Sequence, residues 1–257
     1  MERALAAAGC VAADEEAAEL VARAADDDEL ASLVARRVSG EPLAWITGSA
    51  PFCGLDIVVE PGVYVPRWQS EPLARRAADL LPVEGTAVDL CTGSGAVARV
   101  LGTARPAARV VGTDLDPVAH RCALRNGVDA RLGHLFDPLP VDLLGAVDVV
   151  VGVVPYVPTD ALHLLPRDVV AFEPGAALDG GEGGTVVVAE VIVASTGWLR
   201  SGGWLLLEVG GDQIAPVRQL FDSAGFVDVS VLTDGDGDPR AVEGRVVGTA
   251  RGQASSR

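Results

Sequence analysis

Short apolar runs alternate with amphipathic stretches through the middle and later parts of the chain. The strand-like runs cover residues 87–90, 110–114, 147–151 and 204–209, with a weaker run at 129–132. The helix-like stretches cover residues 96–104, 117–126, 185–199 and 213–224. Strands that alternate with helices in this way predict an α/β fold, in which helices cover both faces of a mainly parallel sheet.

The last part of the chain has a different pattern. Residues 227–232 and 242–249 have the pattern of two strands, and the turn-rich segment Asp234–Pro239 lies between them. This segment is too short to hold a helix, so the two strands cannot be joined by a crossover. We therefore predict that they pair antiparallel at the end of the sheet.

The first seventy residues precede this alternation. Residues 15–38 predict two short amphipathic helices, broken around Asp26–Asp28, whose carboxylates can cap the second helix. Residues 45–60 alternate imperfectly and predict a β-hairpin, and residues 70–81 predict a helix. The expected domains are a short N-terminal helical region at 1–42, a β-hairpin linker at 43–69, a main domain at 70–250 and a disordered tail at 251–257.

Composition narrows the possible functions. Acidic residues outnumber basic ones by 36 to 20, so the formal net charge is −16, and we expect no direct contact with nucleic acid. Every basic residue is arginine, which excludes a Schiff-base lysine and a P-loop lysine. Aromatic residues make up only 4% of the chain, so the core must be aliphatic, as suits buried parallel strands.

Cysteine and histidine positions do not indicate a metal site. The four cysteines are Cys10, Cys53, Cys91 and Cys122, and they form no CxxC pair. The histidines lack metal-ligand spacing, so we expect no metal. The most apolar stretch, residues 141–157, is short and contains Asp142 and Asp148, so we expect no membrane span and a cytoplasmic location.

A glycine-rich loop is the segment with the clearest chemical meaning. Asp89 lies at the end of a predicted buried strand, and Gly93 and Gly95 follow it where the next helix begins. Asp114 ends the following strand, where a carboxylate can accept hydrogen bonds from two ribose hydroxyls. This arrangement predicts a nucleoside-containing cofactor at the carboxyl edge of the sheet.

Two cofactors are compatible with this loop. Residues 93–98 match the GxGxxA form of a dinucleotide loop, which would make the protein an NAD-dependent dehydrogenase. S-adenosyl-L-methionine instead carries an ammonium group, which Asp89 suits, whereas a carboxylate beside a pyrophosphate is unfavourable. We therefore favour S-adenosyl-L-methionine and keep the dehydrogenase as the alternative.

Several separate segments together resemble the HemK/PrmC-type protein glutamine-N5 methyltransferases. These segments are residues 40–48, residues 61–67 with Ser70 and Glu71, residues 89–96, Glu173-Pro174, residues 178–184, and residues 206–210 with Gln213. The resemblance extends from about Gly40 to Arg245 and is specific because it combines motifs that are distant in the sequence.

The resemblance implies a Rossmann-like, seven-stranded class I methyltransferase domain and a small N-terminal helical domain that binds the protein substrate. It further implies S-adenosyl-L-methionine as cofactor and methyl transfer to a glutamine side-chain amide of a translation release factor or another protein. The helical region is shorter here than in the family. We expect cofactor contacts from Asp89, Cys91, Thr92, Gly93, Gly95, Asp114, Leu115, His134 and Leu135, and substrate contacts from Arg67 and Glu173.

The chain departs from the family in its catalytic motif. The family has Asn-Pro-Pro-Tyr after its fourth strand, and this chain has Val153-Val154-Pro155-Tyr156. The family's asparagine carbonyl is understood to accept a hydrogen of the substrate amide, but valine has no acceptor. Val153, Pro155 and Tyr156 are the catalytic positions by resemblance, and the alternative is a catalytically impaired or repurposed binding protein.

A second departure concerns the position that would contact adenine. Residues 133–137 include His134 where the family usually has an acidic residue that meets the adenine amino group. Neutral His134 can act as a hydrogen-bond acceptor there, or Asp137 can reach the same group.

Overall fold

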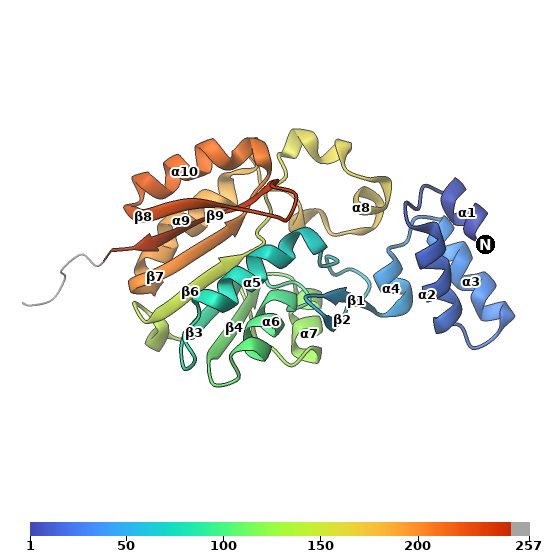
Figure 1. Ribbon diagram of the computed structural model, residues 1–257, viewed down its shortest axis with the longest axis horizontal. Helices are drawn as coiled ribbons and strands as arrows, with labels where there is room; N and C mark the ends of the chain where they lie inside the picture. Colours follow the sequence, from blue (N-terminus) through green and yellow to red (C-terminus); the bar gives the residue numbers. More distant parts are fainter. Residues whose placement is uncertain (248–257) are drawn as a thin grey trace, which may run out of the picture.

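A computed structural model gives the structure of the protein and describes residues 1–247, so the predicted tail at 251–257 and the last two predicted strand residues, Gly248 and Thr249, lie outside the described part. A seven-stranded sheet forms its centre, in the order β5-β4-β3-β6-β7-β9-β8 (Figure 1). The strands are β3 (Thr86–Leu90), β4 (Arg109–Asp114), β5 (Asp129–Leu132), β6 (Val147–Gly152), β7 (Leu199–Glu208), β8 (Phe226–Thr233) and β9 (Pro239–Val246).

The strand directions confirm the predicted α/β sheet with an antiparallel end. Strands β5, β4, β3, β6 and β7 are parallel to one another. Strand β9 pairs antiparallel with both β7 and β8. The five parallel carboxyl ends therefore meet at one edge of the sheet, where chemical groups can converge.

Helices cover both faces of this sheet. They are α5 (Glu71–Leu80), α6 (Ala96–Ala104), α7 (Pro117–Arg125), α9 (Val186–Trp198) and α10 (Ile214–Ser223). Val149 and Val151 of β6 pack with α5 and α6, whereas Val150 packs with α9 and α10. All three valines are fully buried, as expected for a strand whose side chains alternate between two covered faces.

The N-terminal helices lie at one end of the molecule (Figure 1). They are α1 (Glu2–Ala7), α2 (Ala13–Arg23), α3 (Asp27–Val38) and α4 (Leu43–Thr47). As predicted, Asp26 caps the second of the two expected helices, since its Oδ1 accepts the Glu29 N–H at 2.8 Å. Helices α1 and α4 escaped the sequence analysis because each is a short segment stabilised by packing: Leu5 and Ile46 are buried in one cluster with Leu20.

The predicted hairpin is shorter than expected. Strands β1 (Ser49–Phe52) and β2 (Leu55–Val58) pair antiparallel, and the preceding residues form α4 instead. Pro42 precedes this single helical turn and Gly48, with φ of 91°, ends it in the left-handed region. The Trp45 indole donates a hydrogen bond to the Val63 carbonyl at 2.9 Å, which fixes the turn against the chain leading to the main sheet.

The connection between β6 and α9 holds elements that sequence patterns did not predict. It contains helix α8 (Arg167–Phe172) and the 3-10 turns η3 (Thr159–Leu164), η4 (Gly175–Ala177) and η5 (Glu182–Gly184). Three further 3-10 turns are η1 (Trp68–Ser70), η2 (Val141–Leu143) and η6 (Gly211–Gln213). Helix α8 reaches toward the N-terminal helices (Figure 1), and Phe172 contacts Trp45 edge to face, with ring centroids 6.3 Å apart. Within residues 1–247, no helix is both long enough and apolar enough to cross a membrane.

Candidate active site

A cavity of about 380 Å³ opens at the carboxyl ends of β3, β4 and β6. The predicted cofactor residues other than Gly95 all line it, namely Asp89, Cys91, Thr92, Gly93, Asp114, Leu115, His134 and Leu135. Val153 and Pro155 line it as well, from the loop that follows β6. The fold thus gathers segments that are far apart in sequence around one space.

Asp89 is a buried carboxyl group on the cavity wall. It is only 2% exposed, and its Oδ2 accepts hydrogen bonds from the Thr92 hydroxyl at 2.6 Å and the Ala98 N–H at 3.1 Å. Burial raises its pKa to about 7, although these two hydrogen bonds oppose the shift. A cationic group nearby would restore its charge, so the site favours a ligand that carries an ammonium.

Asp114 is held in place by backbone groups. Its Oδ2 accepts the Gly93 N–H at 2.8 Å, and its Oδ1 accepts the Asp116 N–H at 2.9 Å. Burial raises the pKa of Asp114, and the two backbone hydrogen bonds oppose this effect. Each carboxylate oxygen retains a free lone pair, which two neighbouring ribose hydroxyls can use.

The two loop glycines have different structural roles. Gly93, with φ of 57°, lines the cavity, and a Cβ there would meet nothing closer than the Cys91 carbonyl oxygen at 4.0 Å. Gly95, with φ of 83°, caps α6, and a Cβ there would lie 2.8 Å from a methyl group of Val128. Gly93 therefore leaves space for a ligand, whereas Gly95 allows close packing between α6 and the neighbouring segment.

His134 lies at the outer end of the cavity. Its Nε2 is 2.7 Å from a carboxylate oxygen of Glu190 on α9, and both side chains are about half exposed. The adjacent Leu135 is buried and has φ of 43°, which turns the chain back into the cavity wall. Asp137, the alternative adenine contact, does not belong to the cavity lining.

A second cavity, of about 620 Å³, adjoins the first. Tyr64, Val153 and Ala177 line both cavities and form the wall between them. The second cavity is bordered by the N-terminal helices, α8 and the ends of β7 and β9, and it includes the predicted residues Arg67 and Tyr156. A second molecule bound there would face the cofactor cavity across Val153.

Gln213, to which the sequence motifs assigned no role, fixes the loop that carries Val153 and Tyr156. The Gln213 side-chain amide donates to the Tyr156 carbonyl at 2.7 Å and to the Gly183 carbonyl at 3.0 Å. A Cβ on Gly184 would lie 2.0 Å from the Tyr156 carbonyl oxygen, so the glycine-rich segment 178–184 packs directly against this loop. Gln213 and the segment 178–184 therefore both hold the backbone after β6 in position.

Glu208 was not predicted as a site residue. It ends β7, is 3% exposed, and accepts a hydrogen bond from the Tyr156 hydroxyl at 3.0 Å. Burial raises the pKa values of both groups. Its sequence signal is an acidic residue directly after the apolar run 205–207, the same signal that marked Asp89.

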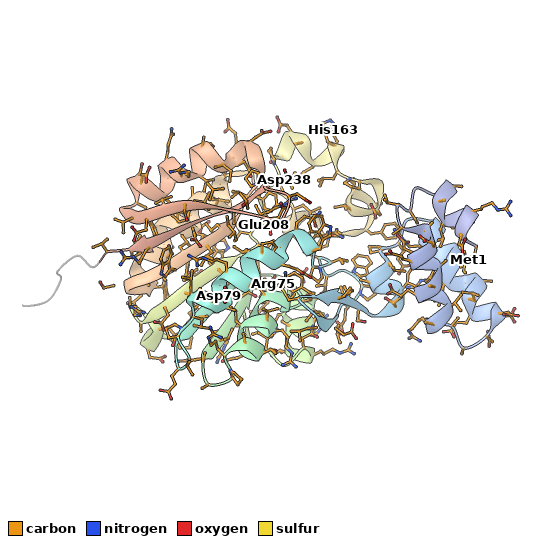
Figure 2. The ribbon with its side chains drawn as sticks, viewed as in Figure 1. Met1, Arg75, Asp79, His163, Glu208 and Asp238 are labelled. Carbon is orange, nitrogen blue, oxygen red and sulfur yellow. The ribbon has the colours of Figure 1, made fainter. Side chains whose placement is uncertain are left out.

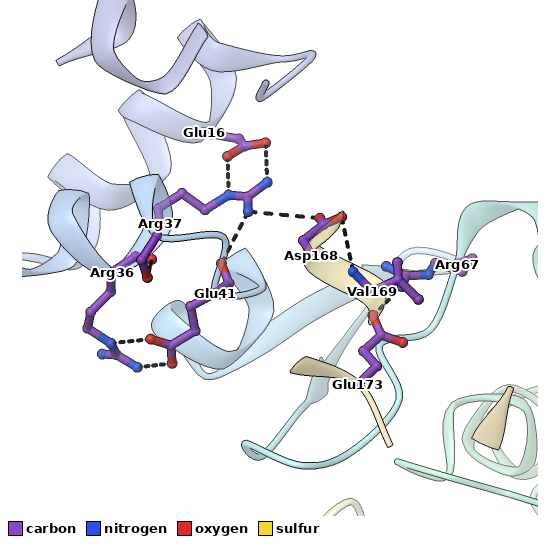
Figure 3. A network of polar contacts seen from close by, with 9 residues as sticks. Glu16, Arg36, Arg37, Glu41, Arg67, Asp168, Val169 and Glu173 are labelled. Carbon is purple, nitrogen blue, oxygen red and sulfur yellow. Dashed lines mark hydrogen bonds and ion pairs between the residues drawn. The ribbon is translucent and has the colours of Figure 1, made fainter. Parts of the chain in front are cut away.

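Arg67 and Glu173 form an ion pair beside the second cavity. The Glu173 side chain is 1% exposed, and its pKa is raised by burial, an effect that Arg67 opposes. Figure 3 shows this pair next to α8, where Asp168 also approaches Arg37 of α3 at 3.9 Å. Arg37 in turn binds Glu16 of α2 at 2.6 Å, so charged contacts connect the N-terminal helices to α8.

The first cavity suits a sulfonium nucleoside better than a dinucleotide. Four carboxyl groups line it, those of Asp89, Asp114, Asp116 and Asp179, and, in the described part of the chain, its wall contains no arginine that could bind a pyrophosphate. A phosphate-bearing ligand would place its negative charge beside Asp89, which is unfavourable. The residues present therefore fit S-adenosyl-L-methionine.

This sheet order and this cavity define the class I methyltransferases, which use S-adenosyl-L-methionine. The fold is similar to that of a methyltransferase from Pyrococcus furiosus, with a TM-score of 0.52 and 19% identity over 76% of this chain and 90% of that one. No family model matches the sequence.

Relatives identify the family within this class. The chain is 39% identical over 212 residues to the release factor glutamine methyltransferase of Geobacter sulfurreducens, covering 80% of this chain and 74% of that protein. It is 38% identical over 208 residues to the enzyme of the same name from Mycolicibacterium smegmatis, covering 78% and 73%. The chain belongs to the release factor glutamine methyltransferase family, which confirms the predicted resemblance and excludes the dehydrogenase alternative.

Proposed function

We propose that this chain methylates the side-chain amide nitrogen of a glutamine in a translation release factor, using S-adenosyl-L-methionine. The observation that carries the proposal is that Asp89 and Asp114 line one cavity, which adjoins a second cavity across Val153. The names of the relatives support the choice of acceptor.

Different residues of the cavity bind different parts of the cofactor. Asp89 offers charge to an ammonium group, Asp114 offers two oxygens to ribose hydroxyls, and Gly93 leaves room beside them. His134 and Leu135 border the space for the base, and Cys91, Thr92 and Leu115 complete the wall. S-adenosyl-L-methionine supplies a methyl group on a positively charged sulfur, and the protein's contribution is to hold the acceptor in line with it.

An amide nitrogen is a weak nucleophile because its lone pair is delocalised into the carbonyl group. The site must therefore orient the amide and accept its hydrogens. Val153 borders the place where the two cavities meet, Pro155 lines the first cavity, and Tyr156 lines the second. Excluding water there strengthens each polar contact with the amide.

The N-terminal region at 1–42 is the proposed docking element for the protein substrate. Residues 9–12, Glu16 and Arg37 line the second cavity, and the Arg67–Glu173 pair flanks it from the main domain. We propose the hairpin at 43–69 as a linker between this region and the methyltransferase domain at 70–250. A release factor loop that enters the second cavity would contact both domains.

Two experiments test the proposed function. Calorimetric titration with S-adenosylhomocysteine should give saturable heat, and no heat at millimolar ligand would contradict the cofactor assignment. Incubation with a release factor and radiolabelled S-adenosyl-L-methionine should then label the factor.

Val153 favours a second candidate, a binding protein that retains the fold and has lost transfer. The Val153→Asn variant separates the two. Transfer by the wild type that equals transfer by the variant excludes loss of activity, whereas transfer by the variant alone supports it.

A further inference from the structure

One oxygen of Glu208 is buried without a partner. The Tyr156 hydroxyl satisfies Oε1, but Oε2 has no hydrogen-bond partner within residues 1–247. The Ser70 hydroxyl is close enough to lower the pKa of Glu208, yet its own oxygen also lacks a partner in this part of the chain. A buried carboxylate oxygen without a partner is strongly unfavourable, so such groups are uncommon outside functional sites.

The position of Glu208 relates it to the altered catalytic motif. Gly152 of β6 pairs with Leu207 of β7 in parallel register, so the next residues along, Val153 and Glu208, lie side by side where the two strands end. Both residues line the second cavity, and Val153 also lines the cofactor cavity. Figure 2 marks Glu208 near the middle of the molecule, far from Met1 at the N-terminal end. The strand beside the motif thus places a carboxyl group next to Val153, which has no acceptor of its own.

Apart from the nearby Ser70 hydroxyl, the neighbouring groups leave this oxygen free for a ligand. Tyr64, Tyr156 and Arg240 are the titratable groups whose charges or hydrogen bonds influence Glu208. Arg240 is engaged by Asp234 at 2.6 Å and does not form an ion pair with Glu208. Tyr156 is a donor to the other oxygen only.

We propose that Glu208 is a catalytic residue that accepts an N–H of the substrate amide through Oε2 and takes the proton released during methylation. This inference rests on the proposed function. In the reaction the methyl carbon–sulfur bond breaks and its electron pair stays on sulfur, while a carbon–nitrogen bond forms on the amide. The amide nitrogen loses one proton to the Glu208 carboxylate, which later releases it to water. The raised pKa of Glu208 matches this role, because a stronger base accepts the proton more readily.

Two substitutions separate the acceptor role from the proton role. Glu208→Gln keeps an acceptor oxygen but cannot take a proton, so kcat should fall about 100-fold or more while the Kd of the release factor stays within a few-fold. Glu208→Leu removes both functions, so the Kd, measured by calorimetry with S-adenosylhomocysteine bound, should also weaken about tenfold. In both variants the Kd of S-adenosylhomocysteine alone should match the wild type, which shows that the fold is intact.

A rescue experiment and a control complete the test. Val153→Asn in the Glu208→Leu background should restore the affinity for the release factor, because asparagine supplies an acceptor at the adjacent position. Glu243→Gln is the matched control, since Glu243 is also a buried acid on the sheet but binds Arg76, at 2.8 Å. It should leave kcat within a few-fold of the wild type.

The outcomes distinguish this proposal from the proposed function. A Glu208→Leu variant with wild-type kcat and wild-type release-factor affinity overturns the role of Glu208 alone. If the wild type binds the release factor without methylating it, the proton role of Glu208 is refuted. The Kd of the release factor for the Glu208→Leu variant then still decides whether the acceptor contact exists. A wild type that binds no release factor refutes both.

Discussion

The charge state of Asp89 should control cofactor affinity near neutral pH. Burial raises its pKa to about 7, and the proposed ammonium contact needs the ionised carboxylate. The apparent Kd of S-adenosylhomocysteine should therefore weaken toward a tenfold change for each pH unit below that value. Between pH 7.5 and 5.5 we expect a loss of roughly twentyfold, measured by calorimetry in buffers of matched ionic strength.

The Asp89→Asn variant should bind more weakly at pH 7.5 and lose most of this pH dependence. Asp114, whose pKa is also raised, can leave a smaller residual slope. Asp142→Asn is a suitable control because Asp142 lies on the surface and its pKa is lowered by Arg109, so it stays ionised throughout the range. A wild-type Kd that does not change between pH 7.5 and 5.5 would refute the reasoning, as would an unchanged slope in Asp89→Asn.

The same group should affect the stability of the ligand-free protein with a defined sign. The folded-state pKa of Asp89 lies above its ordinary value of 3.8, so the folded protein binds more protons than the unfolded chain between these values. Its contribution therefore favours folding at acid pH and is lost as the pH rises to about 7, by about 4 kcal/mol in total. The free energy of unfolding in urea should therefore fall more steeply with rising pH in the wild type than in Asp89→Asn across this range.

Three further substitutions test the packing and the charges around the site. Gly95→Ala should destabilise the fold by about 2 kcal/mol or more in urea unfolding, because its Cβ would lie 2.8 Å from Val128 at a positive φ; wild-type stability would contradict this. Arg67→Met should cost about 3 kcal/mol by leaving Glu173 buried and unpaired, and adding Glu173→Gln should recover part of the loss; no recovery would argue against the ion pair. Gln213→Ala should lower kcat more than S-adenosylhomocysteine affinity, because it releases the loop after β6; equal losses in both would indicate general unfolding.

The sequence predicted the parts of the fold that have regular periodicity. Apolar runs such as 147–151, which only Asp148 interrupts, located the buried strands, because both faces of a parallel strand are covered and most positions are apolar. Asp89 and Asp114 could be assigned to one cavity, because each lies at the carboxyl end of a parallel strand and neighbouring strands end at the same edge.

Other features depend on contacts that have no local signature. Helix α8 packs through Phe172 on Trp45 and through Asp168 on Arg37, and none of these pairs is close in sequence. Gly95 was predicted as a cofactor contact. A side chain at this position would clash with Val128, which belongs to a different segment, and the sequence around Gly95 does not show this contact. Glu208 follows an apolar run as Asp89 does, but only the strand register places it beside Val153.

Mass spectrometry of a release factor after incubation with the protein and S-adenosyl-L-methionine tests the central claim most directly. We expect one added methyl group on a single glutamine side chain, present with the wild type and absent with a variant in which Asp89 and Asp114 are both replaced by asparagine. An unmodified glutamine after prolonged incubation with protein shown to bind S-adenosylhomocysteine would contradict it.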